Sequence, residues 1–186
     1  MALQKRSKDL LRKDAWLLLQ EQQDFLKQKS LKVEGNLAKF FASQQNAKCW
    51  AAFMPLSLEV QIDYSRWPDK DFVFPRCEGQ SMSFYRANPD TFEKHAKWQV
   101  LEPNPALAKK VNANEIDGFL LPGLAFSTKG QRLGKGKAYY DKYLQNLSQT
   151  KVGLTFEFLM KEEIPQESTD VKMDFVITDE QIIEVN

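Results

Sequence analysis

The residues best suited to chemistry lie in the stretch GQRLGKGKAYYD, residues 130–141. A glycine-rich loop that leads into a helix offers backbone N–H groups to phosphate, and Arg132, Lys135 and Lys137 add positive charge. Asp141 follows Lys137 by four residues, so a helix beginning there carries the carboxylate one turn along the same face. Mg²⁺ would relieve its repulsion from phosphate oxygens. The stretch predicts a phosphate site with a carboxylate-held magnesium ion, or else a purely structural turn.

Two familiar nucleotide-binding loops do not match this stretch. A Walker loop has four residues between its first glycine and Gly-Lys, followed by Ser or Thr, whereas GQRLGKGK has three, and Gly136 follows Lys135. The dinucleotide pattern that starts at Gly134 would need its third glycine at Tyr139. Any phosphate site here therefore belongs to another class.

The composition limits the number of domains and the kinds of site that the chain can form. A chain of 186 residues with 42% hydrophobic residues predicts a single domain, 1–186. The formal charge of +1 gives no general attraction to nucleic acid or to an anionic membrane. His95 is the only histidine and Cys49 and Cys77 are the only cysteines, which excludes zinc sites built from several such ligands. Catalysis must then come from carboxylates, cations, backbone amides or a carboxylate-held magnesium ion.

The opening segment, the longest apolar run and the number of cysteines together predict a cytoplasmic protein. The opening MALQKRSKDLLRKD lacks the apolar core of a signal peptide, and the longest apolar run, GFLLPGLAF, is too short to span a bilayer. Two cysteines are too few for a disulfide framework, which fits a reducing compartment.

Apolar periodicity predicts helices that alternate with short strands. Helices are expected at 7–29, 30–48, 89–97 and 137–147, and strands at 49–54, 71–75, 81–87, 117–123, 151–159 and 173–185, with mostly loop at 98–116. Strands that are apolar on both faces, between helices, indicate a largely parallel sheet covered on both sides. Ligands of such sheets bind at the carboxyl ends of the strands. On the first helix, Lys8 and Arg12 project side by side at the border of the apolar stripe.

Taken together, LLPGLAFSTKGQRLGKGKAYYDKYL resembles the signature of the 5-formyltetrahydrofolate cyclo-ligase family, the 5,10-methenyltetrahydrofolate synthetases. That signature runs Pro-Gly-x-x-Phe, then Gly-x-Arg-Leu-Gly-x-Gly, then Tyr-Tyr-Asp. Weaker similarity is seen in KDLLRKD, FMPLSLEVQ, FVFPR, WQVLEP and DVKMDFVIT. The resemblance implies a three-layer α/β/α sandwich with a mostly parallel central sheet, similar to the NagB/RpiA/CoA transferase fold. It also implies a monomeric enzyme that uses ATP and Mg²⁺ to close 5-formyltetrahydrofolate into 5,10-methenyltetrahydrofolate, releasing ADP and phosphate.

The resemblance also assigns roles to individual positions. The catalytic residues it implies are Arg132, Lys137 and Tyr139. The ATP-binding residues are Lys8, Arg12, Arg132, Leu133, Gly134, Lys135, Gly136, Lys137, Ala138, Tyr139 and Tyr140. The folate-binding residues are Met54, Glu59, Trp98 and Tyr139. The magnesium ligands are Asp141 and Asp174. Composition alone would place Lys8 and Arg12 on a solvated helix edge, and Met54 and Trp98 in the core.

Two positions near the loop depart from the family pattern. Ala138 stands where a third glycine is usual, and alanine there is strained by roughly 1 kcal/mol or more if the residue needs a positive φ, but harmless if the helix has already begun. Ser127 stands in place of an aspartate. These departures leave two other interpretations open: a non-catalytic relative that binds nucleotide or folate, and a phosphosugar or acyl-CoA enzyme of similar architecture.

Overall fold

The computed structural model describes residues 2–95 and 100–185. Within these residues, the helices are α1 (Ala2–Glu21), α2 (Leu26–Ser43) and α3 (Tyr139–Leu144). The strands are β1 (Cys49–Ala51), β2 (Asp71–Glu78), β3 (Ser81–Arg86), β4 (Phe92–Lys94), β5 (Leu101–Pro103), β6 (Lys109–Val111), β7 (Gly118–Pro122), β8 (Ala125–Ser127), β9 (Arg132–Leu133), β10 (Thr150–Leu154), β11 (Met160–Lys161), β12 (Phe175–Ile177) and β13 (Ile182–Glu184). None of the helices described is long and apolar enough to cross a membrane.

One large sheet organises the molecule, in the order β13-β12-β10-β7-β1-β2-β3-β6. The strands from β12 to β2 pair in parallel, while β13 at one end and β3 and β6 at the other are antiparallel. The first four residues of β7 are all buried, as expected of a strand covered on both faces. The predicted mostly parallel central sheet is therefore confirmed.

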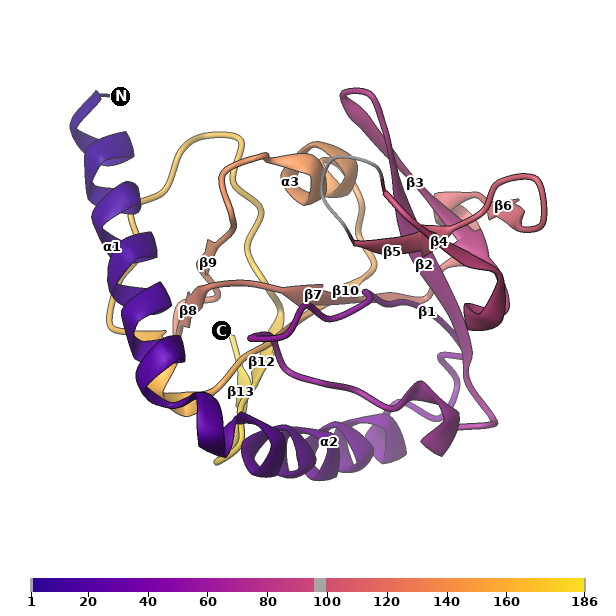
Figure 1. Ribbon diagram of the computed structural model, residues 1–186, viewed down its shortest axis with the longest axis horizontal. Coiled ribbons are helices and arrows are strands. Elements are labelled where there is room, and N and C mark those ends of the chain that lie inside the picture. Colours follow the sequence, from indigo (N-terminus) through magenta and orange to yellow (C-terminus); the bar gives the residue numbers. More distant parts are fainter. Residues whose placement is uncertain (1, 96–99, 186) are drawn as a thin grey trace.

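Alternate residues of the central strands feed two separate cores. Leu120 of β7 belongs to the core under α1 and α2, whereas its neighbours Phe119 and Leu121 belong to the core under α3. Figure 1 shows α2 and α3 on opposite sides of the strands. Helices thus cover both faces, in the expected three-layer arrangement, although α3 is much shorter than the helix predicted over 137–147.

The two N-terminal helices meet earlier than predicted. The structure ends α1 at Glu21, makes a 3₁₀ turn at Gln23–Phe25 and begins α2 at Leu26, instead of placing the junction between 29 and 30. The turn interrupts the helical periodicity, and Phe25, which lies in it, is 55% exposed. No glycine or proline marks this break in the sequence.

The helix predicted over 89–97 is wrong for residues 89–95, which are the part of it that the structure describes. Pro89–Thr91 forms a single 3₁₀ turn, and the chain then becomes β4, which pairs antiparallel with β5. The ring of Phe92 packs edge-on against Phe74 of β2, with centroids 5.2 Å apart. This long-range contact favours the extended backbone over local helix propensity. The described part of the region expected to be mostly loop, 98–116, contains only two strands, β5 and β6, of three residues each.

Gly118 allows β7 to approach a buried tryptophan. A Cβ added to Gly118 would lie 2.3 Å from a ring carbon of Trp50, whose ring also packs against Phe40 and Phe41. We therefore expect Gly118→Ala to lower the free energy of unfolding by about 1–3 kcal/mol, because the buried ring must move.

Gly35 provides a matched control for this substitution. It is exposed in α2, and a Cβ there meets nothing within 4 Å. Gly35→Ala should raise the free energy of unfolding by about 1 kcal/mol. Chemical denaturation followed by tryptophan fluorescence measures both variants, and equal effects would contradict the packing described for Trp50.

Candidate active site

The glycine-rich stretch forms a hairpin, β8–β9, before it reaches α3. The Ser127 hydroxyl donates to the side-chain oxygen of Gln131 at 2.9 Å and accepts the backbone N–H groups of Lys129 and Gln131 at 3.3 Å. Ser127 is fully buried. The serine therefore holds the hairpin turn together, so its departure from the family pattern still gives a closed loop.

Arg132 lies in β9 and reaches the carboxyl end of β7. Its guanidinium donates to Asp141 Oδ2 at 2.7 Å and to the carbonyl oxygen of Pro122 at 3.3 Å, and it lies 5.5 Å from the ring centroid of Tyr140. The side chain is only 5% exposed, and its Nε is buried without a partner among the described residues. Arg132 is thus held rigidly by an ion pair and an aromatic ring, and it has a hydrogen-bond donor to spare.

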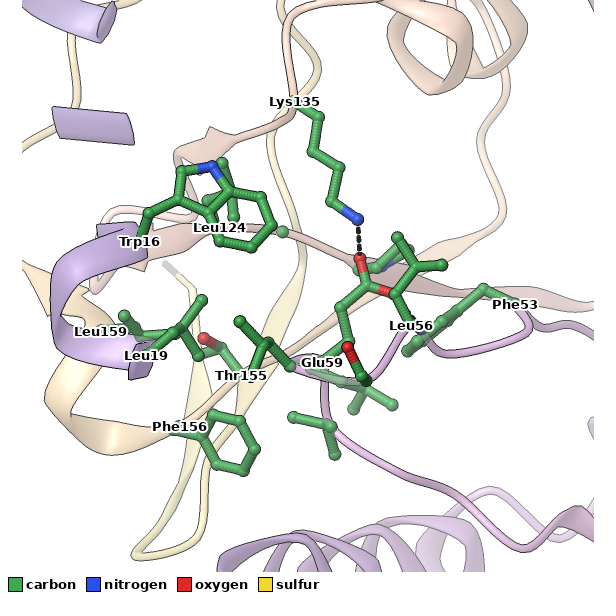
Figure 2. A pocket seen from close by; sticks show the side chains of 16 residues that line it. Trp16, Leu19, Phe53, Leu56, Glu59, Leu124, Lys135, Thr155, Phe156 and Leu159 are labelled. Carbon is green, nitrogen blue, oxygen red and sulfur yellow. Dashed lines mark hydrogen bonds and ion pairs between the residues drawn. The ribbon is translucent and has the colours of Figure 1, made fainter. Parts of the chain in front are cut away.

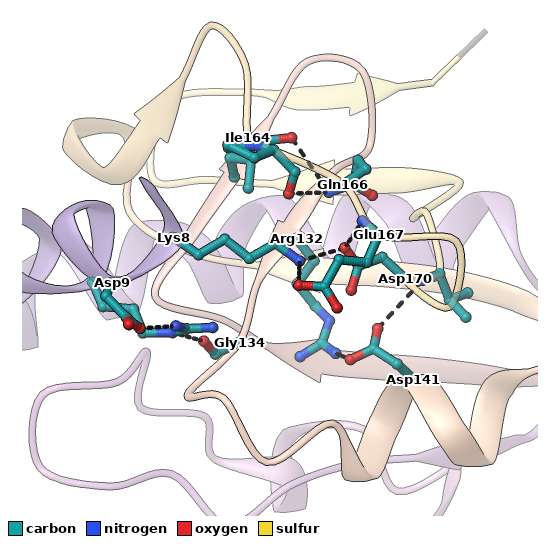
Figure 3. A network of polar contacts seen from close by, with 12 residues as sticks. Lys8, Asp9, Arg132, Gly134, Asp141, Ile164, Gln166, Glu167 and Asp170 are labelled. Carbon is teal, nitrogen blue, oxygen red and sulfur yellow. Dashed lines mark hydrogen bonds and ion pairs between the residues drawn. The ribbon is translucent and has the colours of Figure 1, made fainter. Parts of the chain in front are cut away.

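The first helix carries two further cations of the candidate site. Arg12 Nε donates to the carbonyl oxygen of Gly134 at 2.9 Å, and its Nη1 pairs with Asp9 at 2.5 Å. Lys8 Nζ lies 2.5 Å from Asp170 Oδ2. Figure 3 shows Lys8 and Arg132 approaching the same region from different elements. Arg12 therefore contacts the glycine-rich loop, whereas Lys8 pairs with a carboxylate of the segment that precedes β12; their binding of ATP stays a prediction.

Lys135 connects the loop to a pocket. Its ammonium lies 2.5 Å from Glu59 Oε1, and Glu59 Oε2 accepts the backbone N–H of Leu56 at 2.9 Å. Figure 2 shows this ion pair at the pocket, with Trp16 on one side and Phe53 on the other. The two lysines predicted in the loop differ in placement, because Lys135 lines this pocket and Lys137 does not.

The pocket has a volume of about 190 Å³ and lies at the carboxyl ends of β7 and β10, as expected for an open α/β sheet. Its walls are largely apolar and come from α1, from the chain after β1, and from the ends of β7 and β10. The side chains that form them are Trp16, Leu19, Phe53, Leu56, Leu58, Val60, Leu124, Leu154, Phe156 and Leu159. Cavities for complete drug-sized ligands measure about 300–1,000 Å³, so this one suits one flat ring system.

Four further residues were predicted to contact ATP or the folate, namely Met54, Trp98, Tyr139 and Tyr140. Met54 is half-buried and does not line the pocket, whose wall is formed by its neighbours Phe53 and Leu56 instead. Trp98 lies outside the described residues. The Tyr139 hydroxyl donates to the carbonyl oxygen of Gly79 in the β2–β3 turn at 2.9 Å. Burial raises the pKa of the Tyr140 phenol, so this hydroxyl stays neutral at physiological pH.

Of the lining residues, sequence reasoning predicted only Glu59 and Lys135, and Trp16 and Thr155 are among those that it missed. Trp16 follows Arg12 by four residues, so the helical spacing that predicted the pair Lys8 and Arg12 also places Trp16 on that side of α1. Thr155 follows β10, and its buried hydroxyl has no hydrogen-bond partner among the described residues. Nothing in the local sequence around Thr155 marks it as a pocket residue.

The two predicted magnesium ligands have different surroundings. Asp141 binds Arg132 through one oxygen and accepts the backbone N–H of Val171 at 3.3 Å through the other. Asp174 precedes β12, is 51% exposed and accepts the backbone N–H of Lys151 at 2.7 Å. Asp174 therefore lies at the amino end of β12, whereas the pocket lies at the carboxyl ends of the neighbouring strands.

The donor chemistry of Asp141 fits Mg²⁺, which proteins bind through one or two carboxylates completed by phosphate oxygens and water. Among residues 2–95 and 100–185, no group of three or more His, Cys, Asp or Glu side chains is placed to hold a metal ion by itself. A magnesium ion beside Asp141 would thus depend on the phosphates of a bound nucleotide.

Ala138 has the left-handed backbone conformation, with φ 54° and ψ 20°, immediately before α3. Of the two alternatives for Ala138, a strained positive φ or a residue already inside the helix, the structure therefore shows the first. We expect Ala138→Gly to raise the free energy of unfolding by about 1 kcal/mol, because glycine adopts this conformation without steric strain.

Asn146 provides the control, because it also has a positive φ, of 69°, and asparagine tolerates this region better than alanine. Asn146→Gly should change stability less than Ala138→Gly, as measured by chemical denaturation. Destabilisation by Ala138→Gly would contradict the backbone conformation described.

Comparison with known proteins agrees with this architecture. The model of the 5-formyltetrahydrofolate cyclo-ligase family matches residues 4–179. A probable 5-formyltetrahydrofolate cyclo-ligase of Schizosaccharomyces pombe is 32% identical over 143 residues, which cover 66% of this chain and 68% of that protein. The 5-formyltetrahydrofolate cyclo-ligase of Mycoplasma genitalium is 28% identical over 154 residues, covering 78% of this chain and 81% of that protein.

A solved structure extends the likeness to three dimensions. The 5,10-methenyltetrahydrofolate synthetase of Aquifex aeolicus superposes with a TM-score of 0.80 at 29% identity, covering 96% of this chain and 93% of that one. The family match spans the N-terminal helix, the glycine-rich loop and the C-terminal strands up to β12. The chain therefore belongs to the 5-formyltetrahydrofolate cyclo-ligase family of ligases in folate metabolism.

Proposed function

We propose that the protein uses ATP and Mg²⁺ to close 5-formyltetrahydrofolate into 5,10-methenyltetrahydrofolate, releasing ADP and phosphate. The observation that carries this proposal is the ion pair between Lys135 of the glycine-rich loop and Glu59 of the apolar pocket, at 2.5 Å. Phosphates bound by the loop would lie next to a ring bound in the pocket. Direct phosphoryl transfer needs this proximity of nucleotide and substrate.

The triphosphate would bind among the cations of the loop and α1. Lys8, Arg12 and Arg132 are each held by a carboxylate, which fixes the charges before the nucleotide arrives. The short α3 contributes less than the longer predicted helix would, so the side-chain cations and the loop amides supply most of the attraction. Lys137 and Tyr139 remain proposed catalytic residues from the family resemblance.

The pterin ring would occupy the apolar pocket, with the rest of the folate extending outside it. Glu59 would accept hydrogen bonds from the amino group and ring N–H of the pterin, because its carboxylate offers only acceptors. Trp16, Phe53 and Phe156 would contact the faces and edges of the ring. For this to happen, Glu59 must exchange at least part of its contact with Lys135 for the substrate.

The chemistry follows from these positions. The formyl oxygen bonds to the γ-phosphorus while the bond from that phosphorus to ADP breaks. Nitrogen 10 then bonds to the formyl carbon and loses its proton, and the carbon–oxygen bond breaks with release of phosphate. Arg132 and Lys135 would neutralise the charge on the transferred group. Mg²⁺, held by Asp141 and phosphate oxygens, would add further charge neutralisation; a role for Asp174 stays a prediction from the resemblance.

Spectrophotometry tests the proposed reaction. Purified protein is mixed with 5-formyltetrahydrofolate, ATP and Mg²⁺, and the near-ultraviolet band of the methenyl product is followed with each component omitted in turn. Product that forms only with all three supports the proposal. No product, together with stabilisation of the protein by ATP or folate against heat, would indicate a binding protein without turnover.

We further propose that one chain acts alone, as the family resemblance implies. Gel filtration of the active protein tests this. The cytoplasmic location remains a prediction, with which the free thiols of Cys49 and Cys77 agree.

A further inference from the structure

Glu59, the acid proposed to bind the pterin, lies in a segment without regular secondary structure. The described residues 52–63, between the end of β1 and the 3₁₀ turn at Tyr64–Arg66, form neither a helix nor a strand. Figure 2 shows Glu59 and Leu56 of this segment at the pocket. Because no sheet ladder pairs the backbone of these two residues, the position of the Glu59 carboxylate depends on hydrogen bonds within the segment.

The turn from Leu56 to Glu59 is closed by two hydrogen bonds. The backbone N–H of Glu59 donates to the carbonyl oxygen of Leu56 at 3.0 Å, and the backbone N–H of Leu56 donates to Glu59 Oε2 at 2.9 Å. The side-chain amide of Gln61 then donates to the carbonyl oxygens of both residues, to Leu56 at 2.7 Å and to Glu59 at 2.8 Å. Gln61 therefore ties the two ends of the turn together.

Gln61 is in turn anchored to α2. Its backbone N–H donates to the hydroxyl oxygen of Ser30 at 3.0 Å. Two residues later, the backbone N–H of Asp63 donates to Glu34 Oε1 at 2.6 Å. Ser30 and Glu34 are both buried and lie four residues apart, so they share one side of α2. The helix thus holds the chain that follows Glu59 at two successive points.

We infer that Gln61 is a positioning residue that holds the Glu59 turn in the geometry that binds the pterin; this inference rests on the folate site proposed above. The substrate must replace Lys135 on the Glu59 carboxylate, so that ion pair cannot fix the acid in the bound state. The hydrogen bonds of Gln61 go to backbone carbonyl oxygens and do not involve the carboxylate. They can therefore persist when the folate binds, and they order the turn beforehand.

The two carbonyl oxygens explain why an amide is suited to this position. An amide NH₂ group has two N–H donors, one for each carbonyl oxygen, whereas an ionised carboxylate has only acceptors. Glutamate in place of Gln61 would face the oxygens of Leu56 and Glu59 with like partial charge. Methionine has a similar length but no donor. The two substitutions should thus loosen the turn to different extents.

Steady-state kinetics of Gln61→Met test this inference. We expect the KM for the folate to rise about fivefold, the size that follows from losing a net hydrogen bond between neutral groups, while kcat and the KM for ATP change less than about twofold. Gln61→Glu should raise the KM for the folate further. A smaller rise in Gln61→Glu than in Gln61→Met would contradict the role of the amide donors.

Gln149→Met is the matched control. The Gln149 side chain also donates to a backbone carbonyl oxygen, that of Ala113 at 2.8 Å, and neither residue lines the pocket. We expect less than about a twofold change in either KM. An equal rise in the KM for the folate in Gln149→Met would mean that the effect of Gln61→Met reflects general loosening of the fold.

A double-mutant cycle separates positioning of Glu59 from simple stabilisation. In a Glu59→Gln background, Gln61→Met should raise the KM for the folate less than about twofold further, because its effect passes through the Glu59 carboxylate. A purely structural role would lower the unfolding temperature and change the KM for ATP as well. A normal KM for the folate in Gln61→Met, or an equal rise in the Glu59→Gln background, would overturn the inference.

Calorimetric titration with 5-formyltetrahydrofolate keeps this result distinct from the proposed function. Wild-type protein that binds the folate but forms no product would refute the proposed reaction, while a Kd about fivefold weaker in Gln61→Met would still support the positioning role. Equal folate binding by wild type and Gln61→Met would refute the positioning role alone. Wild-type protein that does not bind the folate would refute both.

Discussion

Replacing Arg132 by alanine is expected to lower kcat/KM by about a thousandfold, the loss typical for a preorganised donor to transition-state charge. Arg132 is buried, pairs with Asp141 at 2.7 Å and lies over Tyr140, so its position is set before the nucleotide binds. The substitution also leaves the Asp141 carboxylate without its cation. We therefore expect a loss of about 3–5 kcal/mol in the free energy of unfolding as well.

Two further variants separate lost chemistry from lost stability. Arg132→Ala combined with Asp141→Asn removes the uncompensated charge and should recover part of the stability without recovering activity. Arg132→Lys keeps the charge but loses the planar fork, and should retain more activity than alanine at equal folded fraction. Steady-state kinetics below the unfolding temperature of each variant measure these effects. Near-normal kcat/KM in folded Arg132→Ala protein would exclude Arg132 from the reaction.

The sheet was predictable because its strands carry their signal locally. The segments around β1 and β7 are apolar on both faces and end at proline, so their burial and parallel pairing follow from short stretches of sequence. The elements that were predicted wrongly depend instead on contacts between distant parts of the chain. β4 is extended because Phe92 meets Phe74, and α1 stops at Glu21 without any breaker residue, so both depend on packing that a local pattern does not contain.

The candidate site was also predictable only where the information lies within a short stretch of sequence. Helical spacing predicts that Lys8 and Arg12 share a side of α1, and the structure places both against partners around the glycine-rich loop. The carboxylate that pairs with Lys8, however, belongs to Asp170, which lies 162 residues away in the sequence. Spacing in the sequence carries no information about such pairs. The wall of the pocket was missed for the same reason.

Replacing Glu59 by glutamine is expected to raise the KM for the folate by about 10- to 100-fold, because a charged hydrogen bond contributes about 1.5–3 kcal/mol and each 1.4 kcal/mol is a factor of ten. Glutamine keeps the size of the side chain, and its amide oxygen can still accept the backbone N–H of Leu56. The KM for ATP should change much less. Stopped or continuous assays with one substrate saturating measure the two constants separately.

Lys135→Met is the matched variant on the other side of the ion pair. It should raise the KM for ATP and leave Glu59 free to bind the folate without competition from the ammonium. In the wild type, phosphate that attracts Lys135 away from Glu59 would strengthen folate binding, and the folate would strengthen ATP binding by the same factor. Titration of the folate with and without a non-hydrolysable ATP analogue measures this coupling, which Lys135→Met should abolish. If Glu59→Gln raised the KM for ATP and left that for the folate unchanged, Glu59 would belong to the nucleotide site and the pocket to another ligand.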